Sequence, residues 1–218
     1  EETIKKLAVI LEKKQKEFGS VIYLISDEPY RELAYDGVEV PYLTKYYDNT
    51  IVGYSYSKSL SLPGERIGYL VIPSEMDESA NVFQAATIAN RVLGCVNAPS
   101  LMQRVIKRCV DANVNLEAYD RNRNLLYNGL KECGFSCIKP EGAFYVMMNM
   151  KGFRGKTMYV KVIESAEDFA QLFLEKGLVA TVPCTAFAAP GFIRWSYATS
   201  LTEIDKGLDR LEAFIKNA

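Results

Sequence analysis

The 218-residue sequence contains no histidine, and this absence excludes several catalytic chemistries. Ser-His-Asp and Cys-His catalysis both need an imidazole base, and most catalytic zinc sites use histidine ligands. The sequence contains five cysteines, an odd number, and their spacing does not match the regular pairs of a metal site. We interpret them as reduced thiols of a cytoplasmic protein and expect no metal site.

Long apolar runs and an excess of one charge are missing too. The longest apolar stretches, such as residues 21–26 and 177–183, are far shorter than the roughly 20 residues that a membrane-spanning helix needs. The 26 Lys and Arg residues nearly cancel the 27 Asp and Glu residues, and no basic stripe is present. We therefore expect neither a membrane nor a nucleic acid as partner. Catalysis would have to use Lys, Tyr, Asp, Glu, Arg or a bound cofactor.

The spacing of apolar residues predicts an α/β part followed by a smaller α+β part. The first part is expected to have strands in a mostly parallel sheet, over residues 20–26, 50–57 and 66–73, and helices over 1–19, 75–93 and 100–112. The second part is expected to have helices over 115–133, 165–177 and 200–218 and strands over 140–150, 178–183 and 191–199. The sequence therefore predicts two domains, 1–114 and 115–218.

Three reactive side chains follow predicted strands of the first part. Asp27 and Tyr30 follow the first strand, and Lys58 follows the second. Ligands of open α/β sheets bind just outside the carboxyl ends of the strands, so these side chains are expected on one rim. An amine, a carboxylate and a phenol, with Arg66 nearby, match what pyridoxal 5'-phosphate needs from a protein. Each residue alone has an ordinary structural explanation, such as a turn cap or a surface charge.

Three separated motifs resemble one known family when they are taken together. They are SDEPYRELAYDG at 26–37, SYSKSLSLPGERIGYL at 55–70 and GFIRWSYA at 191–198. In this order and spacing they are similar to the class I pyridoxal-phosphate aminotransferases of fold type I, and the resemblance extends over essentially the whole chain. It implies that residues 1–114 are the C-terminal part of the cofactor-binding large domain, with its mostly parallel sheet. Residues 115–218 would be the α+β small domain.

The resemblance also implies a role for each matching residue. Lys58 would bind the cofactor covalently and move the proton between the substrate's α-carbon and the cofactor. Asp27 would pair with the pyridinium nitrogen, and Tyr30 would hydrogen-bond the ring oxygen. The phosphate would be bound by Ser55 and Arg66, with Ser57 as a further candidate, and Arg194 would bind the substrate's α-carboxylate.

The function that the resemblance implies is transfer of an amino group between an L-amino acid and a 2-oxo acid such as 2-oxoglutarate. Aspartate is the amino acid that we expect. Two alternatives stay open: a carbon-sulfur lyase with the same cofactor, and the aminotransferase-like sensing domain of a transcription regulator. Members of the family are nearly twice as long, so we expect this chain to be a C-terminal fragment that is inactive alone. The full-length enzyme is expected to be a cytoplasmic homodimer.

Overall fold

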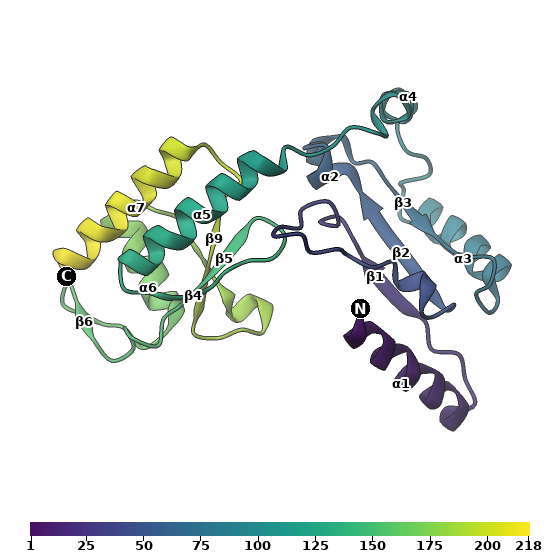
Figure 1. Ribbon diagram of the computed structural model, residues 1–218, viewed down its shortest axis with the longest axis horizontal. Helices are drawn as coiled ribbons and strands as arrows, with labels where there is room; N and C mark the ends of the chain where they lie inside the picture. The colour runs from purple at the N-terminus through teal and green to yellow at the C-terminus, as the bar shows by residue number, and fades with distance from the viewer. The chain divides into compact units, whose positions relative to one another are not determined.

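A computed structural model describes all residues, 1–218, and divides into two compact units, Glu1–Val114 and Asn115–Ala218. None of its helices is long and apolar enough to span a lipid bilayer. The first unit has a three-stranded sheet, four α-helices and two 3-10 turns (Figure 1). In chain order these are α1 (Glu2–Phe18), β1 (Leu24–Asp27), η1 (Leu43–Lys45), β2 (Thr50–Ser55), α2 (Tyr56–Ser59), η2 (Pro63–Glu65), β3 (Gly68–Val71), α3 (Ser79–Val92) and α4 (Ser100–Cys109).

The predicted first helix is present and ends where the sequence indicates. Gly19 follows α1 in the left-handed conformation, with φ 62°, which a residue without a Cβ adopts at little cost. The predicted helix over 75–93 begins later, at Ser79, because residues 74–78 form turns and Glu78 is left-handed with φ 56°.

The sheet of the first unit has the order β1-β2-β3. β1 and β2 are parallel, with Asp27 opposite Gly53, whereas β2 and β3 are antiparallel, with Ser55 opposite Gly68. The expectation of a mostly parallel sheet therefore does not describe the third strand. The connection between β2 and β3, residues 56–67, contains only the short turns α2 and η2, whereas parallel strands are usually joined by a crossover helix.

The second unit is a four-stranded antiparallel sheet with helices, in the order β4-β5-β9-β8. Figure 1 shows α5 and α7 lying side by side, and α5 also packs on β4 and β5. The elements are α5 (Leu116–Glu132), β4 (Ser136–Ile138), β5 (Tyr145–Asn149), β6 (Thr157–Met158), β7 (Lys161–Val162), α6 (Ala166–Leu172), η3 (Phe173–Gly177), β8 (Val182–Pro183), η4 (Cys184–Phe187), β9 (Phe192–Ser196) and α7 (Leu201–Lys216).

Three features of the second unit differ from the sequence prediction. β4 and the small β6–β7 hairpin were not predicted, because two- and three-residue strands carry too few residues for a period-2 pattern. The helix predicted over 165–177 ends at Leu172 and continues as one π turn, Phe173–Gly177. A Cβ at Gly177 would lie 2.4 Å from the Phe173 ring, so glycine lets the chain turn closely around this side chain.

The core of the second unit is a cluster of aromatic rings. Phe169 and Phe173 are fully buried, and both contact Phe214 of α7. Phe173 also contacts Trp195 of β9, with ring centroids 5.7 Å apart. The cluster therefore joins α6, α7 and the sheet that carries Arg194.

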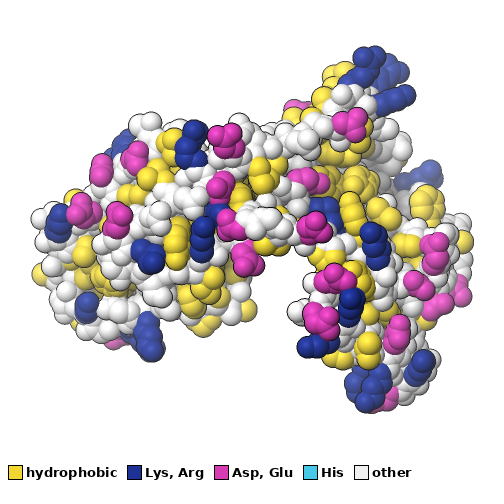
Figure 2. Space-filling view, viewed as in Figure 1, with side chains coloured by type: hydrophobic (Ala, Val, Ile, Leu, Met, Phe, Trp, Pro, Cys, Tyr) yellow, Lys and Arg dark blue, Asp and Glu magenta, His cyan; other side chains and the backbone are white.

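Charged side chains are mostly mixed in sign on the face shown in Figure 2. Dark blue side chains gather over α4, the helix that carries Arg104, Lys107 and Arg108. Acidic and basic side chains are interspersed over the helices of the second unit in the same view.

The start of α6 provides a pH-dependent contribution to stability. Ser165 and Asp168 form a reciprocal capping box, and Lys161 Nζ lies 3.0 Å from Asp168 Oδ1. Lys161 and the Ser165 hydroxyl lower the pKa of Asp168 from 3.8 to about 2. A carboxyl whose pKa is lower in the folded state stabilises the fold above its unfolded pKa and loses this effect as pH falls towards the folded value.

We expect Asp168→Asn to lower the free energy of unfolding of this unit by about 1 kcal/mol at neutral pH, the typical cost of losing a helix cap. The difference from the unchanged protein should shrink as pH falls from about 4 towards 2. Urea unfolding at several pH values measures it. A difference that stays constant over this range would contradict the assignment.

Candidate active site

The carboxyl ends of β1 and β2 bring together the first predicted site residues. Asp27 is the last residue of β1, and Ser55 is the last residue of β2. Asp27 has an exposed carboxylate with no protein hydrogen-bond or ion-pair partner. A Cβ at the opposite residue, Gly53, would lie 4.0 Å from Asp27 Oδ1, so glycine leaves the surroundings of this carboxylate open. A polar ligand can therefore reach Asp27 directly.

Lys58 and Tyr30 lie next to each other at the same rim. Lys58 is in the short α2 turn that follows β2, and its Nζ lies 5.5 Å from the centre of the Tyr30 ring. Both side chains are partly buried. A phenol, a carboxylate and an amine thus lie at the ends of two adjacent parallel strands, as the sequence predicts.

The other two predicted phosphate ligands follow at the same end of β2. Ser57 is a partly buried residue of α2. Arg66 is exposed, and its Nη1 donates a hydrogen bond to the Pro63 carbonyl at 2.9 Å. Arg66 and Ser61 have positive φ values of 52° and 54°, an unfavourable conformation for residues with a side chain.

A cleft of about 600 Å³ opens beside these strands. Asp27 and Ser55 line it, whereas Tyr30, Ser57, Lys58 and Arg66 do not. The remaining lining residues come from β2, β3 and α3 and the loops after them: Gly53, Tyr54, Gly68, Tyr69, Leu70, Ile72, Phe83, Ala86, Thr87, Asn90 and Val96. The first unit therefore combines an accessible carboxylate with a space of ligand size.

Tyr54 holds the turn that carries Lys58. Its hydroxyl donates a 2.7 Å hydrogen bond to the hydroxyl of Ser59, the buried residue next to Lys58. Its ring stacks on Tyr69 at 5.0 Å, which links the turn to β3. Burial, together with the neighbouring Glu32, raises the pKa of Tyr54 to about 12, so the phenol stays protonated and can donate. Sequence reasoning missed Tyr54, because it is one of fourteen tyrosines and its partner is known only from the structure.

Gly68 allows β3 to approach the end of β2. A Cβ at this position would lie 2.3 Å from the Tyr54 carbonyl oxygen and 3.1 Å from Ser55 Cα, both backbone atoms that cannot rotate away. We expect Gly68→Ala to destabilise the first unit by about 1–3 kcal/mol, the usual cost of overpacking. Gly64→Ala, where a Cβ meets nothing within 4 Å, is the matched control and should change stability by less than about 0.5 kcal/mol. Equal unfolding midpoints for the two variants would contradict this account.

Arg194 lies in the second unit, in the middle of β9, and its guanidinium is close to two aromatic rings. The guanidinium carbon is 4.3 Å from the centre of the Tyr145 ring and 4.1 Å from that of Phe187. Tyr145 is two residues from Met147, the register partner of Arg194, and therefore faces the same side of the sheet. Phe187 comes from η4.

The stacked guanidinium has no protein acceptor for its N–H groups. The Arg194 side chain makes no hydrogen bond or ion pair with the chain, although the residue is partly buried. The N–H groups of a guanidinium lie in its own plane and can bind a carboxylate in a bidentate manner. Tyr145 and Phe187 were not predicted as site residues, because their proximity to Arg194 depends on strand register and loop path.

Comparisons with known proteins agree on one family. A sequence profile described as "Aminotransferase class I and II" matches residues 2–211. A probable N-acetyl-LL-diaminopimelate aminotransferase of Bacillus subtilis is 31% identical over 217 residues, which is 99% of this chain and 51% of the relative. An aspartate aminotransferase of Thermotoga maritima is 29% identical over 197 residues, 89% of this chain and 48% of the relative.

Solved structures give the same result for the fold. An aminotransferase of Eubacterium rectale is 45% identical with a TM-score of 0.84, over 99% of this chain and 51% of that structure. The aspartate aminotransferase of Thermotoga maritima is 28% identical with a TM-score of 0.80, over 99% of this chain and 52% of that structure. The predicted fold class is confirmed, and the chain spans about half the length of the relatives that it matches.

Proposed function

Because the chain belongs to the class I and II aminotransferases, we propose that it carries the lysine, the cofactor ligands and the carboxylate-binding arginine of an amino-group transfer reaction. The family depends on pyridoxal phosphate. The observation that carries the proposal is the position of Lys58, Asp27 and Tyr30 at the ends of two adjacent parallel strands. Substrates are an L-amino acid, with aspartate as the leading candidate, and a 2-oxo acid such as 2-oxoglutarate.

The residues of the first unit fit pyridoxal phosphate. Asp27 offers an unpartnered carboxylate, the group that keeps a pyridine nitrogen protonated. The Tyr30 hydroxyl is assigned to the ring oxygen, and the phosphate to Ser55 and Arg66, with Ser57 as a further ligand. The bound cofactor supplies an electron sink that stabilises negative charge on the substrate's α-carbon.

Lys58 is assigned two roles in this proposal. Its amine would hold the cofactor covalently, and its Nζ would take and return the proton at the substrate's α-carbon. Both roles need the amine in its neutral form, which is the nucleophilic and basic form of lysine.

Arg194 is assigned to the α-carboxylate of the substrate. Its N–H groups lack acceptors, and the rings of Tyr145 and Phe187 restrict its rotation. A restrained guanidinium loses less freedom when it binds a carboxylate than a mobile side chain does. This geometry supports binding of a carboxylate. The proposal of aspartate as the amino acid rests on the names of the relatives.

The test of the proposed function is an amino-donor assay on the natural gene product. L-Aspartate with 2-oxoglutarate should yield L-glutamate and oxaloacetate, and no keto acid should accumulate beyond one turnover without the acceptor. N-acetyl-LL-diaminopimelate, the substrate in the name of the Bacillus subtilis relative, is the second donor to compare. Continuous keto-acid release without an acceptor would overturn transamination and indicate β-elimination. We further propose that the active form is a homodimer, which sedimentation of the same preparation tests.

A further inference from the structure

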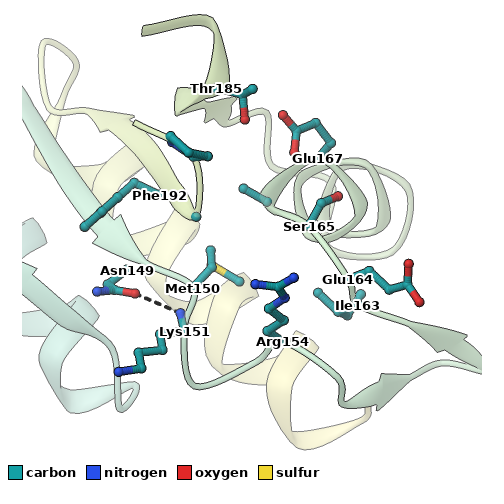
Figure 3. Close-up of a pocket in the computed structure, with 13 residues that line it drawn as sticks. Asn149, Met150, Lys151, Arg154, Ile163, Glu164, Ser165, Glu167, Thr185 and Phe192 are labelled. Atoms are coloured by element: carbon teal, nitrogen blue, oxygen red, sulfur yellow. Dashed lines mark hydrogen bonds between the residues drawn. The ribbon is translucent and has the colours of Figure 1, made fainter. Parts of the chain in front are cut away.

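A second cavity, of about 410 Å³, lies within the unit formed by residues 115–218. It opens between the turn after β5, the segment that leads into α6, and the chain around the start of β9 (Figure 3). It shares no residue with the candidate active site described above. Its lining is Asn149, Met150, Lys151, Arg154, Ile163, Glu164, Ser165, Ala166, Glu167, Thr185, Pro190, Gly191 and Phe192.

The floor of this cavity is apolar. Met150, Ile163 and Ala166 line it and are each 3% exposed or less, so they form a packed surface that does not rearrange easily. Phe192 adds a partly buried aromatic ring. An occupant with an aliphatic or aromatic portion would gain free energy by covering this floor.

The rim of the cavity carries charges of both signs. Arg154 and Lys151 make no hydrogen bond or ion pair through their side chains with the rest of the chain. In Figure 3 the Arg154 side chain extends into the space between Met150 and Ser165. The opposite rim includes Glu167, which lies beside Thr185. A hydrogen bond from the Thr185 hydroxyl lowers the pKa of Glu167, so its carboxylate is charged at neutral pH.

We propose that this cavity binds a zwitterionic α-amino acid with an apolar side chain. Arg154 binds the carboxylate of the amino acid, Glu167 binds its ammonium group, and the side chain covers Met150 and Ile163. The charges of the lining residues support this class of ligand, because two cations, Lys151 and Arg154, are balanced by two carboxylates, Glu164 and Glu167. A simple anion would meet the carboxylates and a simple cation would meet the guanidinium, whereas a zwitterion satisfies both.

The volume agrees with this class of ligand. Pockets for small molecules are typically about 300–1,000 Å³. A cavity of about 410 Å³ therefore accommodates one amino acid together with ordered water that bridges to the polar rim. The protein would then have a second site that binds an amino acid, separate from the candidate active site.

Methionine methyl groups can report on the two sites independently. Met150 lines the cavity, whereas Met147 is opposite Arg194 in the sheet and its sulfur lies 3.4 Å from that of Cys184. With 13C-methyl methionine labels, titration of the full 218-residue chain with L-leucine should shift the Met150 signal in a saturable manner. The Met147 signal should not follow the same curve.

Variants and matched ligands make the test specific. Arg154→Gln and Glu167→Gln should each weaken leucine binding at Met150 by at least about tenfold, which corresponds to 1.4 kcal/mol. Arg121→Gln, at an exposed arginine of α5 outside the cavity, should not change it. 4-Methylpentanoate lacks the ammonium group and 3-methylbutylamine lacks the carboxylate, so both should bind at least about tenfold more weakly than leucine.

The remaining methionine signals confirm that each variant is folded. Absence of a saturable shift at Met150 would overturn the proposal. Equal affinity of leucine and 4-methylpentanoate would overturn the assignment of Glu167. Leucine affinity that is unchanged by Arg154→Gln would overturn the carboxylate contact.

Discussion

Arg194→Gln is expected to lower kcat/KM of the natural gene product for its amino donor by about 30- to 1,000-fold, equivalent to about 2–4 kcal/mol. The reason is that the substrate carboxylate would lose a bidentate, charge-assisted partner that two aromatic rings hold in place. Arg194→Lys keeps the charge but removes the planar fork, so its loss should be smaller than that of the glutamine variant. Steady-state kinetics with L-aspartate and 2-oxoglutarate measure both.

Two further variants separate the role of Arg194 from a general effect on folding. Phe187→Leu removes one ring above the guanidinium and should raise KM by a few fold with little change in kcat, because a partly exposed cation–π contact is worth about 0.5–1 kcal/mol. Arg121→Gln is the matched control for loss of a positive charge in the same unit. If Arg194→Gln and Arg121→Gln have the same kcat/KM, Arg194 does not bind the substrate carboxylate.

The second large effect is on stability. Phe173→Ala is expected to lower the free energy of unfolding of the second unit by about 3–5 kcal/mol, the usual cost of removing a fully buried phenylalanine. Phe173 contacts Phe169, Trp195 and Phe214, so its loss leaves a cavity between α6, the sheet and α7. Few single substitutions lower the free energy of unfolding by as much. The size of the loss therefore tests whether Phe173 is packed as the structure shows.

Leu174→Ala provides the comparison for this variant, because Leu174 is the next residue in the same π turn and is 50% exposed. This variant should lower the free energy of unfolding by less than about 1 kcal/mol, because folding buries little apolar surface at this position. Urea denaturation followed by Trp195 fluorescence reports on this unit, because Trp195 is the single tryptophan. Similar losses for Phe173→Ala and Leu174→Ala would contradict the observed packing.

Local sequence patterns were sufficient to place Asp27 and Lys58 at the ends of neighbouring strands. Their positions could be predicted because each directly follows a predicted strand, and the ends of parallel strands meet at one edge of a sheet. Arg194 could be recognised only through its motif, since one arginine within a strand is not a distinctive pattern. The long helices were predicted for the same local reason, and α5 and α7 are present close to their expected limits.

Features that depend on pairing between distant segments were not accessible to sequence reasoning. The antiparallel direction of β3 goes with a connection that has no crossover helix, and the apolar pattern of β3 does not encode this direction. The rings around Arg194 come from β5 and η4, and only the register of β5 with β9 shows that Tyr145 reaches the guanidinium. Arg154 and Glu167 likewise come together only when the turn after β5 lies near α6.

The most direct test of the central claim is covalent trapping of the cofactor on this chain. The purified chain is mixed with pyridoxal phosphate, reduced with borohydride and digested, and the labelled peptides are identified by mass. Lys45→Ala is the matched control, because Lys45 Nζ lies 5.5 Å from the centre of the Tyr42 ring, as Lys58 Nζ does from that of Tyr30. The account predicts a label on Lys58 that Lys58→Ala removes and Lys45→Ala leaves unchanged. A label spread over many surface lysines, and unaffected by Lys58→Ala, would contradict it.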